Sequence, residues 1–90
     1  MAGPNAFLKK MGFSETDRVV ILHADDIGMC QSTVSAYADM LEFGLISSAA
    51  VMVPCSWFPA AARRIVELSA HKPDVGVHMT LTAEWTAYRW

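Results

Sequence analysis

The sequence lacks several features that would place it in a specialised class of protein. No apolar run approaches the roughly 20 residues that span a membrane, and residues 1–10 lack the long apolar core of a signal peptide. The two cysteines, Cys30 and Cys55, form no C-x-x-C pair, so neither a disulfide framework nor a thiolate metal site is indicated. The formal charge of -2 offers no attraction for nucleic acid or an acidic membrane. We therefore expect a cytoplasmic protein with free thiols, no nucleic-acid partner and no membrane span.

The composition is that of a small and unusually apolar globular domain. The 90 residues are 53% hydrophobic and 18% charged, a balance that argues against intrinsic disorder. A short chain has a large surface for its volume, so part of this apolar content should be buried against something else. We therefore expect a homo-oligomer, or pairing with the remainder of a longer parent chain.

Three apolar segments are typical of β-strands. They cover residues 18–24, 46–53 and 75–81, and the first is a continuous run rich in β-branched residues, as in parallel strands buried on both faces. In the third segment, Val75, Val77, Met79 and Leu81 alternate with Gly76, His78, Thr80 and Thr82. Residues 1–17 mix Gly, Pro, Asn and Lys, and we interpret them as a loose lead-in with room for one short helix.

Two helices are predicted between these strands. In residues 32–43, one face collects Val34, Tyr37, Ala38 and Leu41, and Gly44 is a natural C-terminal stop. The second helix is expected to begin with Ser56 as N-cap and Pro59 in its first turn, to bury Phe58, Ala61, Ala62, Ile65 and Leu68, and to end before Pro73. The order β-α-β-α-β predicts an α/β domain over residues 18–90, with parallel strands and right-handed crossovers.

Three polar residues lie at positions where α/β folds with parallel strands usually carry their functional side chains. Asp25 and Asp26 directly follow the first predicted strand, Gly28 then allows a tight turn, and His78 lies in the second half of the third strand. The carboxyl ends of parallel strands meet at one edge of the sheet. Carboxylate and imidazole suit a divalent metal such as Zn, Mg, Mn or Co. One acid could bind the metal while its neighbour serves as a base.

Plainer interpretations of these residues stay open. The two acids could lead a helix from a polar loop, and His78 could be a hydrogen-bonded core histidine. His23, inside the first predicted strand, is interpreted as structural. The tail residues Trp85, Tyr88 and Trp90 could stack on sugar rings or belong to a core.

The motifs "HADDIG" (residues 23–28) and "VGVHMTLT" (residues 75–82), with "GLISSAAVMV" (residues 44–53) between them, resemble the YdjC-like carbohydrate deacetylases. This family includes the chitooligosaccharide deacetylase and hopanoid-associated deacetylases. Its members carry a similar A-D-D-[FI]-G after the first strand and G-[VL]-H-x-x-L-T in the third. The resemblance covers roughly residues 18–82.

The resemblance implies a role for each of the three polar residues. Asp25 would be the general base, and Asp26 and His78 would be ligands of a divalent metal that helps to hydrolyse an N-acetylated sugar or oligosaccharide to acetate and a free amine. The family fold is a barrel-like α/β domain much longer than this chain, and it supplies a further metal-ligating histidine from a later segment. We therefore expect the chain to correspond to the first part of such an enzyme, with an incomplete metal site.

Two other classes of function compete with this one. A non-catalytic, self-associating fragment of a deacetylase would need no complete site. A receiver domain also places paired acids after its first strand to hold Mg, but it needs an aspartate at the end of the third strand, where this chain has His78, Thr80 and Thr82. A phosphatase of the haloacid-dehalogenase type would need D-x-D, whereas Asp25 and Asp26 are adjacent.

Overall fold

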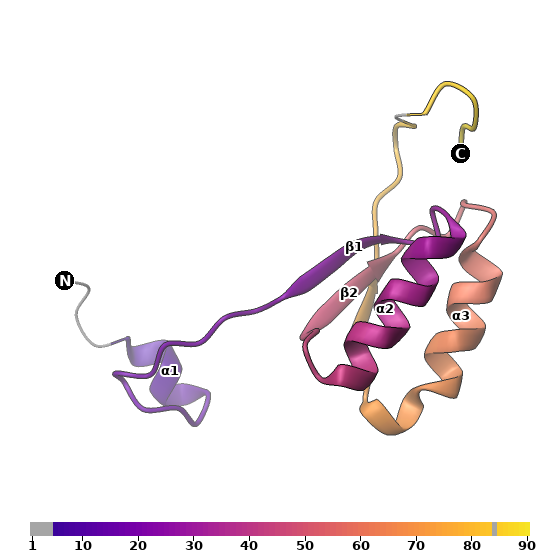
Figure 1. Cartoon of the computed structure of the whole chain (residues 1–90). Helices are drawn as coiled ribbons and strands as arrows, with labels where there is room; N and C mark the ends of the chain where they lie inside the picture. Colours follow the sequence, from indigo (N-terminus) through magenta and orange to yellow (C-terminus); the bar gives the residue numbers. More distant parts are fainter. Residues whose placement is uncertain (1–4, 84) are drawn as a thin grey trace.

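The computed structural model describes residues 5–83 and 85–90, and its sheet has three parallel strands (Figure 1). The elements are α1 (Ala6–Lys10), β1 (His23–Ile27), α2 (Gln31–Phe43), β2 (Ser48–Val51), α3 (Phe58–Glu67), a short 3-10 helix η1 (Ser69–His71) and β3 (Val75–Val77). The strand order is β1-β2-β3, and both pairings are parallel. The predicted α/β fold with parallel strands, like the first part of a β/α deacetylase domain, is confirmed.

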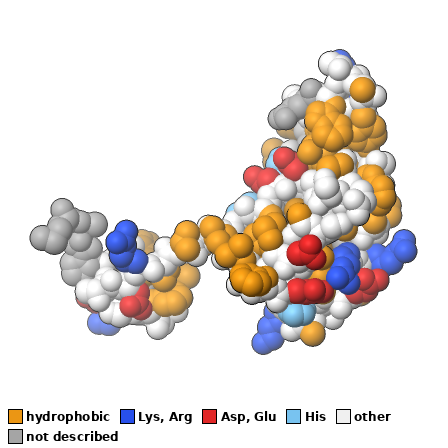
Figure 2. Space-filling model, in the orientation of Figure 1, with side chains coloured by type: hydrophobic (Ala, Val, Ile, Leu, Met, Phe, Trp, Pro, Cys, Tyr) orange, Lys and Arg blue, Asp and Glu red, His pale blue; other side chains and the backbone are white. Residues whose placement is uncertain are grey.

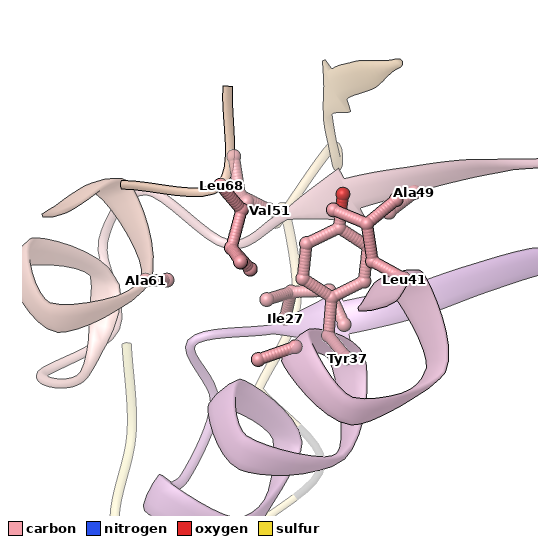
Figure 3. Packing of buried hydrophobic residues seen from close by; sticks show 8 residues of the cluster. Ile27, Tyr37, Leu41, Ala49, Val51, Ala61 and Leu68 are labelled. Atoms are coloured by element: carbon pink, nitrogen blue, oxygen red, sulfur yellow. The ribbon is translucent and has the colours of Figure 1, made fainter. Parts of the chain in front are cut away.

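The core lies between the sheet and the two longer helices. Tyr37, Ala38 and Leu41 of α2 are buried, as their helical spacing predicts, and Val34 is partly buried. Figure 3 shows how Tyr37 and Leu41 pack with buried residues of the strands, of α3 and of the turn after it: Ile27, Ala49, Val51, Ala61 and Leu68. This core holds β1 and β2, and therefore the residues at their ends, in a defined position.

The predicted C-terminal end of α2 is confirmed, whereas the predicted N-cap of α3 is wrong. Gly44 closes α2 in the left-handed conformation, with φ 83°, as predicted. Ser56 is not the N-cap of α3: the cap is Trp57, which makes no side-chain capping bond. The reason lies in the turns before the helix, where Cys55 N–H donates to the Met52 carbonyl and Phe58 N–H donates to the Cys55 carbonyl.

The first strand lies later in the sequence than its apolar run predicted. It covers His23–Ile27 and not residues 18–24, and Val20 and Ile21 are 74% and 75% exposed. The cause is the length of its neighbour: β2 begins at Ser48, which pairs with His23, so residues 18–21 run past the end of β2. The expectation that this run is buried on both faces is wrong in this structure.

The second and third strands are also shorter than predicted, and the short β2 limits the third as it limits the first. They cover Ser48–Val51 and Val75–Val77, in place of 46–53 and 75–81. The last bond from this part of the chain to β2 runs from His78 N–H to the Val51 carbonyl, at 2.9 Å. Beyond it β2 offers no partner, and Met79 and Leu81 are 75% and 86% exposed.

The N-terminal part of the chain extends away from the sheet and its helices. Figure 1 shows α1 at the end of an extended segment, and Figure 2 shows hydrophobic side chains gathered along that segment. The radius of gyration is 16.2 Å, whereas a compact domain of this length has about 12 Å. Helix α1 contains no buried residue, so this arm adds nothing to the core. Among residues 5–83 and 85–90, no helix has the length and apolarity to cross a membrane.

Candidate functional site

Asp25 and Asp26 lie inside β1 and not after it, at an irregularity of the strand. The pairing with β2 shifts register between Ala24 and Ile27, and Asp26 has a left-handed backbone with φ 62°. Successive side chains of a regular strand point to opposite faces, and a bulge can redirect one of them. Here both carboxylates approach the same imidazole: Oδ1 of Asp26 is 3.4 Å and Oδ1 of Asp25 is 3.8 Å from Nε2 of His78.

The turn after the two acids is fixed by its contacts with both helices. Gly28 has φ 96°, which confirms the predicted turn, and a Cβ at this position would lie 3.1 Å from Cα of Phe58. Its N–H donates to Oγ1 of Thr33 at 3.0 Å, and its carbonyl accepts from Trp57 N–H at 3.2 Å. The close approach that only glycine permits holds the strand end against the start of α3.

His78 presents one ring nitrogen to the acids because the other is engaged. Nδ1 lies 2.8 Å from the carbonyl oxygen of Met79, which can only accept a hydrogen bond. In the neutral imidazole, Nδ1 therefore carries the proton and Nε2 has a free lone pair. That lone pair faces the oxygen of Asp26 across 3.4 Å, and two acceptors face each other favourably when a cation or a proton lies between them. This tautomer is the one in which a histidine binds a metal through Nε2.

His23, which the sequence led us to interpret as structural, contacts one of the two acids. Its Nε2 lies 3.1 Å from Oδ1 of Asp25, and its Nδ1 lies 2.7 Å from Oγ of Ser48 on the neighbouring strand. The available signal was the spacing of two between His23 and Asp25, which places both side chains on the same face of a strand. The serine could not be found in this way, because its position depends on the register between β1 and β2.

A shallow pocket of about 70 Å³ lies beside the Asp26–His78 pair. It is also lined by Met29, Met52, Met79, Thr80, Thr82 and Trp90. His78, Thr80 and Thr82 line the same pocket although they lie beyond β3, but Met79 between them lines it too, so the strict alternation predicted for the third segment does not extend past the strand. The pocket is therefore built from the ends of all three strands and the C-terminal tail.

The tail is held near the site by its aromatic residues. Trp85, Tyr88 and Trp90 pack edge-on or tilted against one another, with ring centroids 6.2–6.3 Å apart. The hydroxyl of Tyr88 accepts a hydrogen bond from Ser56 N–H at 2.7 Å. This bond ties the tail to the turn before α3 and brings Trp90 to the pocket.

The donor atoms at this site fit a divalent metal. Two ligands bound at about 2.0–2.1 Å to a tetrahedral ion lie about 3.3–3.4 Å apart, and the Asp26–His78 separation is 3.4 Å. Among residues 5–83 and 85–90, no group of three or more His, Cys, Asp or Glu side chains is arranged to hold a metal. Asp26 and His78 would thus form part of a coordination shell, with Asp25 beside it.

Comparison with known proteins agrees with these motifs. A family model described as YdjC-like protein matches residues 19–89. A carbohydrate deacetylase from Thermus thermophilus is 38% identical over 72 residues, which are 80% of this chain and 22% of that protein. The chain therefore spans about a fifth of the length of this relative. The predicted resemblance is confirmed, and the chain belongs to the YdjC-like protein family.

Proposed function

We propose that this chain carries part of the active site of a metal-dependent deacetylase of N-acetylated carbohydrates. One observation carries the proposal: Nε2 of His78, left unprotonated by the bond from Nδ1 to the Met79 carbonyl, faces the carboxylates of Asp25 and Asp26. A related protein that bears the name carbohydrate deacetylase supports the reaction and the class of substrate.

The three residues divide the work by their positions. Asp26 and His78 would hold the divalent metal (Zn, Mg, Mn or Co), which when bound polarises the acetyl carbonyl and makes water more acidic. Asp25 would be the general base, because its carboxylate lies next to the pair but is also held by His23. It would accept the proton of the attacking water, so that the amide is cleaved to acetate and a free amine.

The site would take a further ligand from outside residues 1–90. Catalytic zinc usually has three protein ligands and one exchangeable position, and Asp26 and His78 supply two. We propose that the third comes from the remainder of a longer chain or from a second copy.

Metal binding tests the proposal directly. The 90-residue chain is titrated with Zn²⁺ by calorimetry, together with Asp26→Asn, His78→Ala and, as control, His71→Ala at the end of η1. Asn tolerates the left-handed backbone of position 26, so Asp26→Asn removes the charge and not the fold. Affinity should fall by about tenfold or more in the two site variants and stay unchanged in the control. Equal affinities in all four proteins would refute the proposal.

Acetate release from an N-acetylglucosamine oligomer tests the reaction itself. Any turnover by this chain should require the metal, because water alone is too weak a nucleophile for an amide at neutral pH. Asp25→Asn should lose turnover while keeping most of its metal affinity. Full activity in excess chelator, or in Asp25→Asn, would contradict the mechanism.

We also propose that the chain self-associates through the exposed extended segment of residues 19–22, which precedes β1. Val20 and Ile21 are 74% and 75% exposed, and their backbone runs beyond the end of β2. Two such β-branched segments from two copies could pair edge to edge and bury apolar surface on both chains. Sedimentation equilibrium over a dilution series should show a dimer that Ile21→Lys weakens. The control, Val66→Lys at a 73% exposed position of α3, should have no effect, and a monomer at all concentrations would refute the proposal.

Three expectations from the sequence stay predictions. They are the division into a lead-in of residues 1–17 and a domain of residues 18–90, the cytoplasmic location, and the lack of a nucleic-acid partner.

A further inference from the structure

We propose that His23 and Ser48 determine which of the two adjacent aspartates binds the metal and which one stays free to act as the base. His23 is then a positioning residue for Asp25, and Ser48 acts through His23. The inference rests on the proposed function, in which Asp26 is a ligand and Asp25 is the base, and it adds the structural cause of that division.

The two carboxylates are chemically equal, and both lie near the same imidazole. Oδ1 of Asp26 is 3.4 Å and Oδ1 of Asp25 is 3.8 Å from Nε2 of His78. Two ligands of a tetrahedral ion lie about 3.3–3.4 Å apart, and Asp25 exceeds that separation by only about 0.4 Å. The side chain of Asp25 is 60% exposed, so packing does not hold it away. An unrestrained Asp25 would therefore be drawn into the coordination shell of a divalent cation.

Coordination of Asp25 would deprive the reaction of its base. A carboxylate oxygen bound to a cation accepts a proton less readily, because the cation stabilises the ionised form. A second carboxylate in the shell would also occupy a position that a catalytic site keeps open for water or substrate. The proposed reaction therefore requires that Asp25 is held close to the metal without binding to it.

His23 provides this restraint through a hydrogen bond. Its Nε2 lies 3.1 Å from Oδ1 of Asp25, which is the same oxygen that approaches His78. An ionised carboxylate can only accept, so Nε2 of His23 carries the proton and donates it to this bond. The bond engages the oxygen nearest to the metal position. Within residues 5–83 and 85–90, Oδ2 of Asp25 has no side-chain partner, so it can accept the proton of water.

Ser48 holds the imidazole of His23 in the orientation that this bond requires. Its Oγ lies 2.7 Å from Nδ1 of His23, and the two residues are paired in the register between β1 and β2. Asp26 lies beyond this pair, at the shift in register and with a left-handed backbone of φ 62°, and its carboxylate approaches His78 instead. The two acids thus have different partners: a hydrogen-bond donor for Asp25 and a metal ligand for Asp26.

A double-mutant cycle on metal binding tests the inference in the 90-residue chain. Zn²⁺ affinity is measured by calorimetry in the unmodified chain, in Asp25→Asn, in His23→Ala and in the double variant. Asp25→Asn should change the affinity little while His23 is present. In the His23→Ala background, the same substitution should lower the affinity by about tenfold or more, because the released Asp25 has become a ligand. A merely structural role of His23 would lower the affinity of both chains alike, without this coupling.

Cobalt(II) absorption gives a second measurement that does not depend on affinity. The visible spectrum of this ion responds to the number and geometry of its ligands, so His23→Ala should change the spectrum. Adding Asp25→Asn to that variant should restore it, because the extra carboxylate ligand is removed. His23→Gln keeps an N–H donor on a side chain of similar reach, and it should retain the spectrum of the unmodified chain.

Two adjacent serines separate the role of Ser48 from a general effect on the strand. Ser48→Ala should increase the effect of Asp25→Asn on Zn²⁺ affinity, but less than His23→Ala does, because the imidazole loses its orientation and keeps its N–H. Ser47→Ala is the matched control, since Oγ of Ser47 accepts a hydrogen bond from Leu22 N–H and should leave the effect unchanged. Identical behaviour of the two serine variants would overturn the role of Ser48.

The outcomes separate this inference from the proposed function. A Zn²⁺ affinity that depends on Asp26 and His78, without coupling between His23 and Asp25, would overturn the inference and leave the metal site standing. Coupling in a chain whose affinity does not depend on Asp26 would support the restraint on Asp25 and refute the proposed ligand set. A tenfold loss of affinity in Asp25→Asn with His23 present would show that Asp25 is already a ligand, and it would also overturn the inference.

Discussion

His23 and Ser48 face each other across neighbouring strands, with Nδ1 of the histidine 2.7 Å from Oγ of the serine. The other ring nitrogen of His23 lies 3.1 Å from Oδ1 of Asp25. An ionised carboxylate can only accept, so Nε2 of a neutral His23 carries the proton and Nδ1 accepts from the Ser48 hydroxyl. The serine thereby orients the ring that holds Asp25.

We predict that neutral His23 exists mainly as the Nε2–H tautomer. Long-range proton–nitrogen NMR correlations at a pH where the imidazole is neutral measure the tautomer directly, and the exposed His71 provides a reference within the same molecule. Ser48→Ala and Asp25→Ala should each reduce the preference, because each removes one of the two partners. A dominant Nδ1–H tautomer in the unmodified chain would contradict this arrangement.

Because Asp26 has a left-handed backbone, we predict that glycine and alanine substitutions have opposite orders of stability at positions 25 and 26. An L-residue with this conformation costs about 1–2 kcal/mol, and glycine avoids most of that cost. Asp26→Gly should therefore have a higher free energy of unfolding than Asp26→Ala. At Asp25, whose φ is not positive, the order should be the opposite, because glycine gains more freedom in the unfolded chain. Urea denaturation of the four variants measures both differences, and the same order at both positions would disprove the explanation.

A side chain at position 28 should destabilise the fold by crowding the start of α3. A second glycine with a similar backbone conformation, Gly44, serves as the reference for the cost of that conformation alone. Gly28 and Gly44 have similar positive φ values, 96° and 83°, but only at Gly28 would an added Cβ lie within 3.1–3.2 Å of the Phe58 backbone. Gly44→Ala should cost about 1 kcal/mol of unfolding free energy for the backbone conformation alone. Gly28→Ala should cost about 1–3 kcal/mol more, because β1 and α3 must move apart. Equal losses in thermal or urea unfolding would show that the contact is unimportant.

The two cysteines should differ in reactivity. The hydrogen bond from Ser32 lowers the pKa of Cys30, whereas burial raises the pKa of Cys55 and the negative charge of Asp26 raises it further. The thiolate is the reactive form, and a lowered pKa gives Cys30 more thiolate at neutral pH. Mass spectrometry after iodoacetamide treatment should find Cys30 modified first. Ser32→Ala should slow that reaction by raising the pKa, and an unchanged rate would count against the hydrogen bond as its cause.

Local patterns in the sequence were sufficient for the order and type of the elements. The spacing of Tyr37, Ala38 and Leu41 predicted the buried face of α2, and Gly44 predicted its end, because both depend on the geometry of a single helix. The motifs around Asp25, Asp26 and His78 predicted the family for a similar reason: each motif is a short contiguous stretch of sequence, so it is recognised without knowledge of the tertiary structure. The parallel order of the strands followed from their alternation with helices.

Only the tertiary structure decided how far each strand extends and which side chains meet. A strand exists where a neighbour can accept its hydrogen bonds, so the short β2 limits both β1 and β3, and the apolar residues 19–22 lie exposed despite their composition. The approach of both Asp25 and Asp26 to His78 depends on the irregular register of β1, which no periodic pattern contains. The bond from Ser48 to His23 and the position of Trp90 over the pocket join residues far apart in the chain. Such contacts depend on packing and register. Their interaction energy arises between two segments, so it cannot be inferred from the sequence of either segment alone.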